Sequence, residues 1–384
     1  MFKLSSSAFS ALVLSAVVTF AYDPTRNDNL VVYWGQNSYG ETHGSDTPNW
    51  QKTISNYCQV PAFYTSVAES LTSTLEMKAP FSTTCNDNGV SGSCASLAAG
   101  IQACQAKGKL VTLSLGGGGT TTARFATAAD AVSFADTIWN DFLGGSSGAH
   151  RPFGAAVLDG VDLDIESGTE TGYVNRGCIP EVLHANLNSI ASYYLTAAPQ
   201  CPYPDAWVGC ALNTVPFDAV YVQFYKKITN SGLKSYPSSG WNYATWNTWA
   251  IGAPNPNVKI FIGAPASTTA ANAGEYVSAS TLGSIALATR GNAAYSHNFG
   301  GVMLCVHPAN SRFDQAIKNI LTGTTNCGAG ASSNPCTHTY TVKSGDTCSI
   351  IEAQNGISDA HLHALNPAIN SGCTNLAIGQ ILCI

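Results

Sequence analysis

Three acidic residues occupy alternate positions in mid-chain: Asp162, Asp164 and Glu166. Apolar residues at 161, 163 and 165 separate them, and strict alternation is the period of a β-strand. The three carboxyl groups then share one face of the strand, with about 7 Å between successive Cα atoms. Carboxylates this close push their pKa values apart, so one of them can stay protonated near neutral pH. A carboxylic acid held beside an ionised carboxylate is what cleavage of a glycosidic bond requires.

Two simpler interpretations fit the same pattern. A strand whose polar face meets solvent also alternates in this way, and a D-x-D-x-E run could ligate calcium. The flanking residues favour a chemical site, because Gly160 and the small residues at 154–156 allow other segments of the chain to approach closely.

Composition and charge limit the classes of partner. The chain has 384 residues, enough for one large domain and a small one. Its formal net charge is -6 and it has no Lys/Arg cluster, so we expect no nucleic acid as a partner. A neutral polymer such as a polysaccharide fits better, and the 16 Tyr and 7 Trp could supply stacking faces for sugars in addition to filling the core.

The first 21 residues have the features of a secretory signal peptide. Lys3 precedes an apolar stretch from Ala8 to Val18, and Thr19–Ala21 fits a small-x-small cleavage site. That stretch is too short to span a bilayer, and no other segment has about 18 uninterrupted apolar residues, so we expect no membrane association. Thirteen cysteines without C-x2-C spacing favour disulfides in a secreted, extracellular protein over zinc ligands.

Apolar, β-branched runs alternate with helical patterns along most of the chain. The predicted strands are Leu30–Trp34, Lys109–Leu115, Val157–Ile165, Tyr193–Ala198, Ala219–Tyr225, Val258–Gly263 and Gly301–Val306, with a weaker one near Val60–Val67. The predicted helices are Ser96–Ala106, Ala123–Phe142, Pro180–Ser192, Ala271–Thr289 and Arg312–Leu321. This alternation predicts an α/β fold, and eight strands predict a (β/α)8 TIM barrel with its active site at the carboxyl ends of the strands. Glu166 comes at the carboxyl end of its predicted strand, which is where the active site of such a barrel is expected.

The composition changes after the last of these helices. Residues 325–336 form a Gly/Ser/Thr-rich linker, so the barrel is expected over 22–324 and a compact segment over 337–384. The segment is predicted to fold as a strand at Thr339–Val342, two short helices and a strand at Ile381–Ile384. Because so short a segment buries little apolar surface, its four cysteines are expected to form a local disulfide framework: Cys336, Cys348, Cys373 and Cys383.

The string LDGVDLDIE at 158–166 resembles the signature of the family 18 glycoside hydrolases. YWGQN at 33–37, SLGG at 114–117 and QFY at 223–225 resemble further motifs of the plant- and fungal-type chitinases of that family. The resemblance implies hydrolysis with retention, in which the acetamido carbonyl of the sugar attacks the anomeric carbon.

The same resemblance implies roles for individual residues. Glu166 would protonate the leaving oxygen, Asp164 would hold the acetamido N–H, and Asp162 would share a proton with Asp164. Tyr225 would hold the acetamido carbonyl. The implied substrate-binding residues are Tyr33, Gln223, Gly116 and Gly117.

Two positions depart from the family's pattern. Cys305 occupies the place on the eighth strand where the family usually has a tryptophan, and Lys226 replaces an asparagine that commonly follows the tyrosine of the sixth strand. Both changes bear on the rate and the fit of the substrate. The nested disulfides of the subgroup imply the pairs Cys58–Cys104 and Cys85–Cys94, and we expect Cys305 to remain outside any disulfide.

The compact segment 337–384 resembles a fungal-type LysM domain, through YTVKSGDTC at 340–348, ALNPAIN at 364–370 and GQILC at 379–383. LysM domains bind N-acetylglucosamine polymers through two loops of a βααβ fold. The implied sugar-binding residues are Gly345, Asp346, Thr347, Asn366, Pro367 and Ile369. SGDT and NP also fit a helix cap and a helix stop, and both roles are compatible with sugar binding.

Both domains indicate chitin and its oligomers as the partner of a secreted chitinase, expected to be a monomer and to need neither a metal nor an organic cofactor. Two other functions fit the same residues. One is a chitin-binding protein with an inactive or very slow barrel, and the other is an endo-β-N-acetylglucosaminidase acting on N-glycans.

Overall fold

The structure is a computed structural model. It describes residues 23–35, 43–58, 63–68, 84–87, 90–93, 97–117, 127–146, 151–166, 193–225, 232–270, 274–305, 312–323, 339–343, 345–366, 369, 372–374, 376 and 380–384. The predicted signal peptide, the linker 325–336 and the predicted helix Pro180–Ser192 therefore lie outside the described residues. No helix in the described part of the chain is long and apolar enough to cross a membrane.

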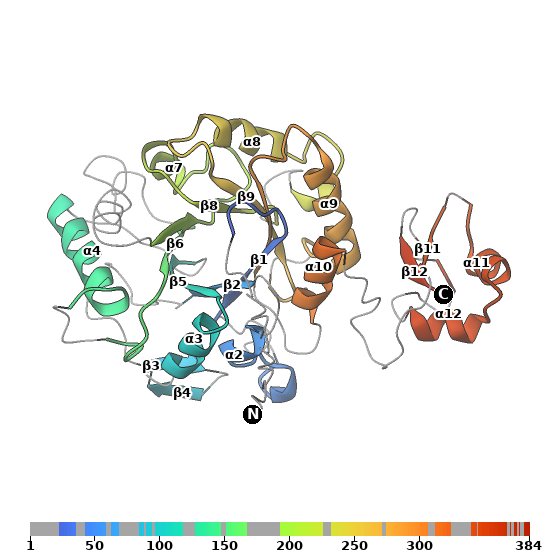
Figure 1. Cartoon of the computed structure of the whole chain (residues 1–384), viewed down its shortest axis with the longest axis horizontal. Coiled ribbons are helices and arrows are strands. Elements are labelled where there is room, and N and C mark those ends of the chain that lie inside the picture. Colours follow the sequence, from blue (N-terminus) through green and yellow to red (C-terminus); the bar gives the residue numbers. More distant parts are fainter. Residues whose placement is uncertain are drawn as a thin grey trace, which may run out of the picture.

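Parallel strands close into a barrel at the centre of the larger domain (Figure 1). Around the barrel they follow the order β1-β10-β9-β8-β7-β6-β5-β2. Their bounds are β1 (Asn29–Trp34), β2 (Phe63–Ala68), β5 (Leu110–Gly116), β6 (Gly160–Asp164), β7 (Tyr194–Ala197), β8 (Ala219–Gln223), β9 (Lys259–Pro265) and β10 (Phe299–Cys305). The predicted eight-stranded barrel is confirmed, including its weakest strand, β2.

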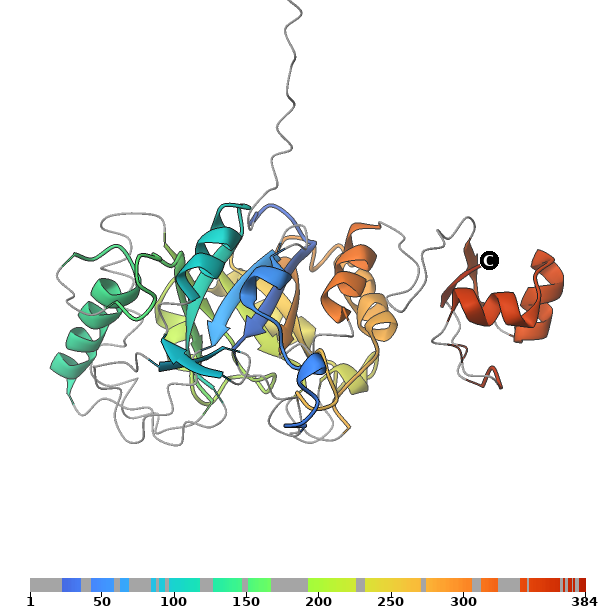
Figure 2. The same cartoon turned by 90° about the horizontal axis from the view of Figure 1, so that it is seen from below.

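Helices surround the strands, as the view from below shows (Figure 2). They are α2 (Ile54–Tyr57), α3 (Ala98–Gln105), α4 (Ala128–Phe142), α7 (Gly209–Thr214), α8 (Tyr243–Gly252), α9 (Ala279–Gly291) and α10 (Phe313–Thr322). An antiparallel hairpin, β3 (Thr84–Asp87) and β4 (Val90–Ser93), and two short 3-10 turns, Thr47–Asn49 and Leu233–Ser235, complete the described part of this domain.

Alternation along each strand separates two packed layers. Val161 and Leu163 of β6 belong to the large apolar cluster that includes the helices, whereas the alternate residues Asp162 and Asp164 lie on the opposite, inner face. On β1, Tyr33 likewise joins a small cluster of strand residues inside the barrel. The period of two therefore places the acids inside the barrel.

Capping residues explain where two helices begin later than predicted. Thr127 and Asp130 form a reciprocal capping box, in which the Thr127 backbone N–H donates to Asp130 Oδ2 at 2.8 Å, so α4 begins at Ala128. Ser278 caps α9 by accepting from the Thr281 N–H at 3.2 Å. Helix α8 was not predicted, because apolar Ala244 and Ile251 lie on its exposed side and polar Asn247 lies on its buried side, so the sequence shows no single apolar stripe.

The carboxyl-terminal module has the predicted βααβ order. Strands β11 (Thr339–Thr341) and β12 (Ile381–Cys383) pair antiparallel, with α11 (Cys348–Asn355) and α12 (Asp359–Leu365) between them in the chain. A small apolar core holds the module together: Val342, Cys348, Ile351, Leu362, Ile369 and Leu382.

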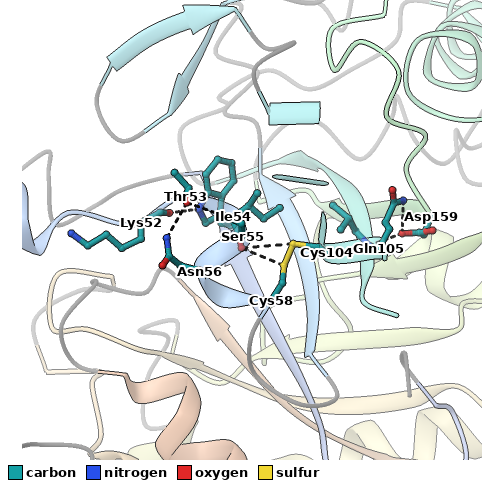
Figure 3. Close-up of a disulfide and its surroundings, with 11 residues drawn as sticks. Lys52, Thr53, Ile54, Ser55, Asn56, Cys58, Cys104, Gln105 and Asp159 are labelled. Atoms are coloured by element: carbon teal, nitrogen blue, oxygen red, sulfur yellow. Dashed lines mark hydrogen bonds between the residues drawn. A yellow bond between two sulfur atoms is a disulfide. The ribbon is translucent and has the colours of Figure 1, made fainter. Parts of the chain in front are cut away.

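The predicted disulfide between Cys58 and Cys104 is present and joins the end of α2 to α3 (Figure 3). In the module, Cys348 bonds to Cys373, and Cys383 also takes part in a disulfide. Cys305 is a thiol, as expected, and so are Cys201 and Cys210. The side chain of Cys85 and the whole of Cys94 and Cys336 lie outside the described part of the chain, so the pair Cys85–Cys94 stays a prediction.

Candidate active site

Asp162 lies at the centre of a hydrogen-bonded cluster inside the barrel. Its side chain is fully buried, and three hydroxyl groups donate to it: Tyr33 to Oδ2 at 2.6 Å, Ser114 to Oδ2 at 2.8 Å and Thr196 to Oδ1 at 2.7 Å. Ser114 and Thr196 pair directly with Asp162 on the strands to either side. Parallel pairing therefore sets the three side chains in one row.

Burial raises the pKa of Asp162, and the hydrogen bonds from Tyr33, Thr196 and Ser114 only partly offset this. The protonated form is thus more accessible than in an ordinary aspartate. The phenol of Tyr33 has its own pKa well above the usual value, because it is buried and lies beside the charges of Asp162 and Asp164. It therefore remains a hydrogen-bond donor across the physiological range.

Gln223, at the end of β8, connects the other two acids. Its side-chain Nε2 donates to Asp164 Oδ1 at 2.8 Å and to the Ala198 carbonyl at 2.9 Å, and lies 3.4 Å from Glu166 Oε1. The Gln223 Oε1 atom is buried without a hydrogen-bond partner among the described residues. The amide thus fixes Asp164 and leaves one acceptor for another group.

Glu166 lies two residues after the last residue of β6 and is partly exposed, whereas Asp164 is 6% exposed. Along β6, exposure therefore increases from Asp162 to Glu166, toward the carboxyl end of the strand. The acid that solvent reaches is the one predicted to give its proton to a leaving group.

Tyr225 and Cys305 lie together beside these acids. Burial raises the pKa of Tyr225 well above its usual value, and the neighbouring Cys305, Asp164 and Glu166 raise it further. The Tyr225 hydroxyl therefore keeps its proton and can donate a hydrogen bond. Cys305, the last residue of β10, is partly exposed and packs against the cluster inside the barrel that contains Tyr33 and Tyr225. It therefore offers a thiol where a tryptophan would offer a ring.

Gly116 and Gly117 lie against the backbone of Asp164. Gly116 pairs with Asp164 and has φ +112°, and a Cβ there would come within 2.3 Å of the Asp164 carbonyl oxygen. That oxygen accepts a hydrogen bond from the Gly117 N–H at 2.6 Å. The two glycines therefore position the strand that carries the acids, in addition to their predicted place in substrate binding.

Two further aspartates, one at each end of the barrel, hold backbone groups in place and were not predicted to do so. Asp159 lies before the amino end of β6, where its Oδ2 accepts from the Val111 N–H and from Gln105 Nε2 (Figure 3). Asp205 is buried in the loop after β7 and accepts hydrogen bonds from three backbone N–H groups of that loop. Its pKa is raised mainly by burial and also by the nearby charge of Glu166. Asp159 belongs to the sequence signature, whereas nothing in the sequence marks Asp205.

The predicted sugar-binding residues of the module have structural roles as well. Gly345 has φ +89°, and Asp346 Oδ2 accepts from the Lys343 N–H and the Tyr340 hydroxyl. Thr347 caps α11.

Near the other predicted loop, Asn366 exchanges two hydrogen bonds with the backbone of Cys383. Ile369 is buried in the core of the module, so only its backbone can face a sugar. Pro367 lies outside the described residues.

One group in the described part of the chain has a metal-ligand arrangement: Cys348, His363 and Cys373. Two of its three ligand atoms are the sulfurs of a disulfide, which makes them poor ligands for a metal.

Comparison with curated proteins finds chitinases of fungi and plants. An endochitinase of Saccharomyces cerevisiae is 36% identical over 289 residues, which cover 74% of this chain and 48% of the relative. The acidic endochitinase SE2 of Beta vulgaris is 37% identical over 320 residues, covering 82% of this chain and 99% of the relative. The chain spans about half the length of several fungal chitinases that it matches.

Among solved structures, the ICChI chitinase from Ipomoea carnea is 28% identical, with a TM-score of 0.59 over 76% of this chain and 98% of that chain. The xylanase and alpha-amylase inhibitor protein XAIP-II from Scadoxus multiflorus is 29% identical, with a TM-score of 0.58 over 77% of this chain and 98% of that chain. The same barrel is therefore found in a chitinase and in an inhibitor protein.

Two family models match different parts of the chain. The model of glycosyl hydrolases family 18 matches residues 29–326, and the LysM domain model matches residues 340–384. Most of the chain is covered by the first model, so this protein belongs to family 18 of the glycosyl hydrolases and carries a LysM domain after its barrel.

Proposed function

We propose that this protein is a secreted chitinase that hydrolyses β-1,4-linked N-acetylglucosamine chains with retention at the anomeric carbon. The observation that carries the proposal is the way one strand presents its three acids: hydroxyl groups hold buried Asp162, and the Gln223 amide lies between Asp164 and the partly exposed Glu166. The family supplies the reaction class, and the arrangement of the acids fits it.

In the first step, the Glu166 carboxyl gives its proton to the glycosidic oxygen as the bond from that oxygen to the anomeric carbon breaks. The acetamido carbonyl oxygen of the same sugar forms the new bond to the anomeric carbon, which gives a cyclic oxazolinium ion. In the second step, the Glu166 carboxylate takes a proton from water, and the water oxygen attacks the anomeric carbon and reopens the ring. Two inversions leave the configuration retained.

Asp162 and Asp164 support the cation in this scheme. A raised pKa lets Asp162 take up the proton that it shares with Asp164, so that Asp164 becomes fully ionised when it holds the acetamido N–H. Tyr225, which keeps its own proton, donates to the acetamido oxygen. The LysM domain binds the same polymer and keeps the barrel close to an insoluble substrate.

Replacing the Glu166 carboxyl by an amide tests the proposal. Glu166→Gln should lower the rate of hydrolysis of soluble chitin oligomers about 100- to 10,000-fold and leave binding to chitin beads unchanged. Asp136→Asn makes the same chemical change on the exposed side of α4 and should keep wild-type activity. Equal hydrolysis by Glu166→Gln and the wild type would refute the assignment of the proton donor.

A chitin-binding protein with an inactive or very slow barrel is the second candidate, and Cys305 is the observation that favours it. Without the tryptophan that the family usually has at this position, the site lacks a stacking face beside Tyr225. Absence of turnover of soluble chitin oligomers by the wild type, combined with retention on chitin beads, would select this candidate.

The third candidate keeps the chemistry and changes the substrate to N-glycans. Product release from chitin oligomers is therefore compared with release of glycan from a high-mannose glycoprotein. Release only from the glycoprotein would select an endo-β-N-acetylglucosaminidase.

A further inference from the structure

A depression on the outside of the barrel is a candidate for a second binding site. It has a volume of about 530 Å³ and lies between the end of α7 and one face of α8. These helices are neighbours in Figure 1, and Trp249 Nε1 of α8 donates to Asn213 Oδ1 of α7 at 3.1 Å. The lining includes Tyr203, Asn213, Thr245, Thr248 and Trp249. We refer to this depression as the α7–α8 groove.

Tyr203 provides an aromatic surface at one side of the groove. Its side chain is 41% exposed and packs in a T-shaped contact with Trp246, with ring centroids 5.3 Å apart. Trp246 is fully buried and its Nε1 donates to the Cys201 carbonyl at 2.9 Å, which fixes its own position. A ring held in this way loses little conformational freedom when a ligand stacks on it.

The rest of the lining is neutral and hydroxylated. No described residue that lines the groove is charged. The Thr248 hydroxyl donates to the Ala244 carbonyl at 3.0 Å, so its oxygen still has a lone pair for an N–H or O–H donor. An exposed ring next to threonine and asparagine side chains matches a ligand with apolar sugar faces, hydroxyl groups and amide groups, and does not match an anionic polymer.

The loop that carries Tyr203 also reaches the active site. It begins after β7, at the end of the barrel where Glu166 lies, and Gln200 forms a bridge with Gln223. Two residues after Tyr203, Asp205 lies within electrostatic reach of Glu166. One short segment therefore connects the candidate catalytic site to the α7–α8 groove.

We propose that the α7–α8 groove is a secondary binding site for a chain of β-1,4-linked N-acetylglucosamine, separate from both the active site and the LysM domain. The identity of the sugar rests on the function proposed above. A second contact on the barrel itself raises the local concentration of polymer at the active site and limits the orientations in which the barrel meets an insoluble chain.

Local chemical protection tests the site without relying on catalysis. The full-length Glu166→Gln chain is nitrated with and without a soluble N-acetylglucosamine hexamer, and the modification of Tyr203 is quantified by peptide mapping. We expect the hexamer to lower nitration of Tyr203 at least about threefold, because a stacked sugar covers the ring. Thr248→Gln, which fills the groove from an exposed helical position, should abolish this protection. Ile251→Ala, on the same helix and outside the lining, is the matched control and should retain it.

Rates on two substrates provide a second test. In the active chain, Tyr203→Ala and Thr248→Gln should each slow the hydrolysis of insoluble chitin about three- to tenfold and leave the rate on a short soluble oligomer unchanged. If the hexamer does not protect Tyr203 from nitration and the wild-type chain hydrolyses chitin, the groove is not a binding site and the proposed function is retained. Protected Tyr203 in a wild-type chain that hydrolyses nothing would support the groove and reject the proposed function.

Discussion

The Tyr33 hydroxyl, on the first strand of the barrel, donates a hydrogen bond of 2.6 Å to Asp162 Oδ2 on the fourth strand in chain order. Both side chains are buried, and each shifts the titration of the other. The charge of Asp162 raises the pKa of Tyr33, and the hydrogen bond from Tyr33 lowers the pKa of Asp162. This contact therefore adjusts the pH at which the acid pair of β6 takes up its proton.

Tyr33→Phe should move the acid limb of the pH profile of kcat/KM to higher pH. Removing the hydrogen bond raises the pKa of Asp162 further, so the Asp162–Asp164 pair takes up its second proton at a higher pH. Because the variant also loses a charge-assisted hydrogen bond to Asp162, we expect its kcat to be about tenfold lower. Thr196→Val should shift the limb in the same direction, and Thr196→Ser, which retains the hydroxyl, should not. An acid limb that stays in place in both Tyr33→Phe and Thr196→Val would contradict this coupling.

Gly116→Ala should damage both stability and activity. A Cβ at this position meets the Asp164 carbonyl oxygen at 2.3 Å, and φ of +112° adds backbone strain. We expect the free energy of unfolding in urea to fall by about 2–4 kcal/mol. Because β6 must move, the hydrolysis rate should fall even in the fraction that stays folded.

Gly291→Ala is the control for this substitution. Gly291 ends α9, and a Cβ there has nothing within 4 Å, so stability should stay the same or rise by up to about 1 kcal/mol. Wild-type stability and activity in Gly116→Ala would show that the strand tolerates the clash.

The strand that carries the acids could be predicted because the alternation of apolar and acidic residues coincides with the family 18 signature at residues 158–166. Val161 and Leu163 pack outward while Asp162 and Asp164 point inward, as a period of two requires. The partners of those acids could not be predicted in the same way. Ser114 and Thr196 reach Asp162 only because the register of three parallel strands sets them in one row, and register depends on contacts between distant segments.

Helix α8 shows a different limit of sequence reasoning. Trp246 and Trp249 pack on each other at 5.7 Å, while other ring contacts of the helix point toward β10 and toward the loop after β7. Polar Asn247 lies on the buried face of α8 and apolar Ile251 on its exposed face, so the apolar periodicity of the helix gives no signal. The α7–α8 groove depends on this helix and was therefore also invisible in the sequence.

Lys318 should make the stability of the protein increase with pH in the alkaline range. Its Nζ lies 3.4 Å from Oδ2 of Asp28, the residue before β1. Burial lowers the pKa of Lys318 to about 8, although Asp28 opposes the shift. Between about pH 8 and 10.5 the unfolded chain keeps a proton that the folded chain has lost, so the free energy of unfolding rises with pH. The contribution is at most about 3 kcal/mol.

Urea unfolding of the wild type and Lys318→Met at about pH 7 and about pH 10 measures this contribution, since methionine has no proton to lose. The difference in unfolding free energy between wild type and variant should move in favour of the wild type as the pH rises. Lys234→Met removes an exposed lysine and provides the baseline. Parallel pH curves for wild type and Lys318→Met would exclude Lys318 as the titrating group.

Cys305→Trp should strengthen substrate binding, because it places a ring at the end of β10 beside Tyr225. If stacking on a sugar resembles stacking on a base, the gain is about 1–3 kcal/mol, which lowers KM for a short soluble chitin oligomer about 5- to 150-fold. Cys305→Ser keeps the size of the side chain and should leave KM close to that of the wild type. Thermal melting of all three proteins checks that the larger ring has not loosened the barrel. A KM for Cys305→Trp equal to that of Cys305→Ser, in folded protein, would mean that the sugar does not pass over this position.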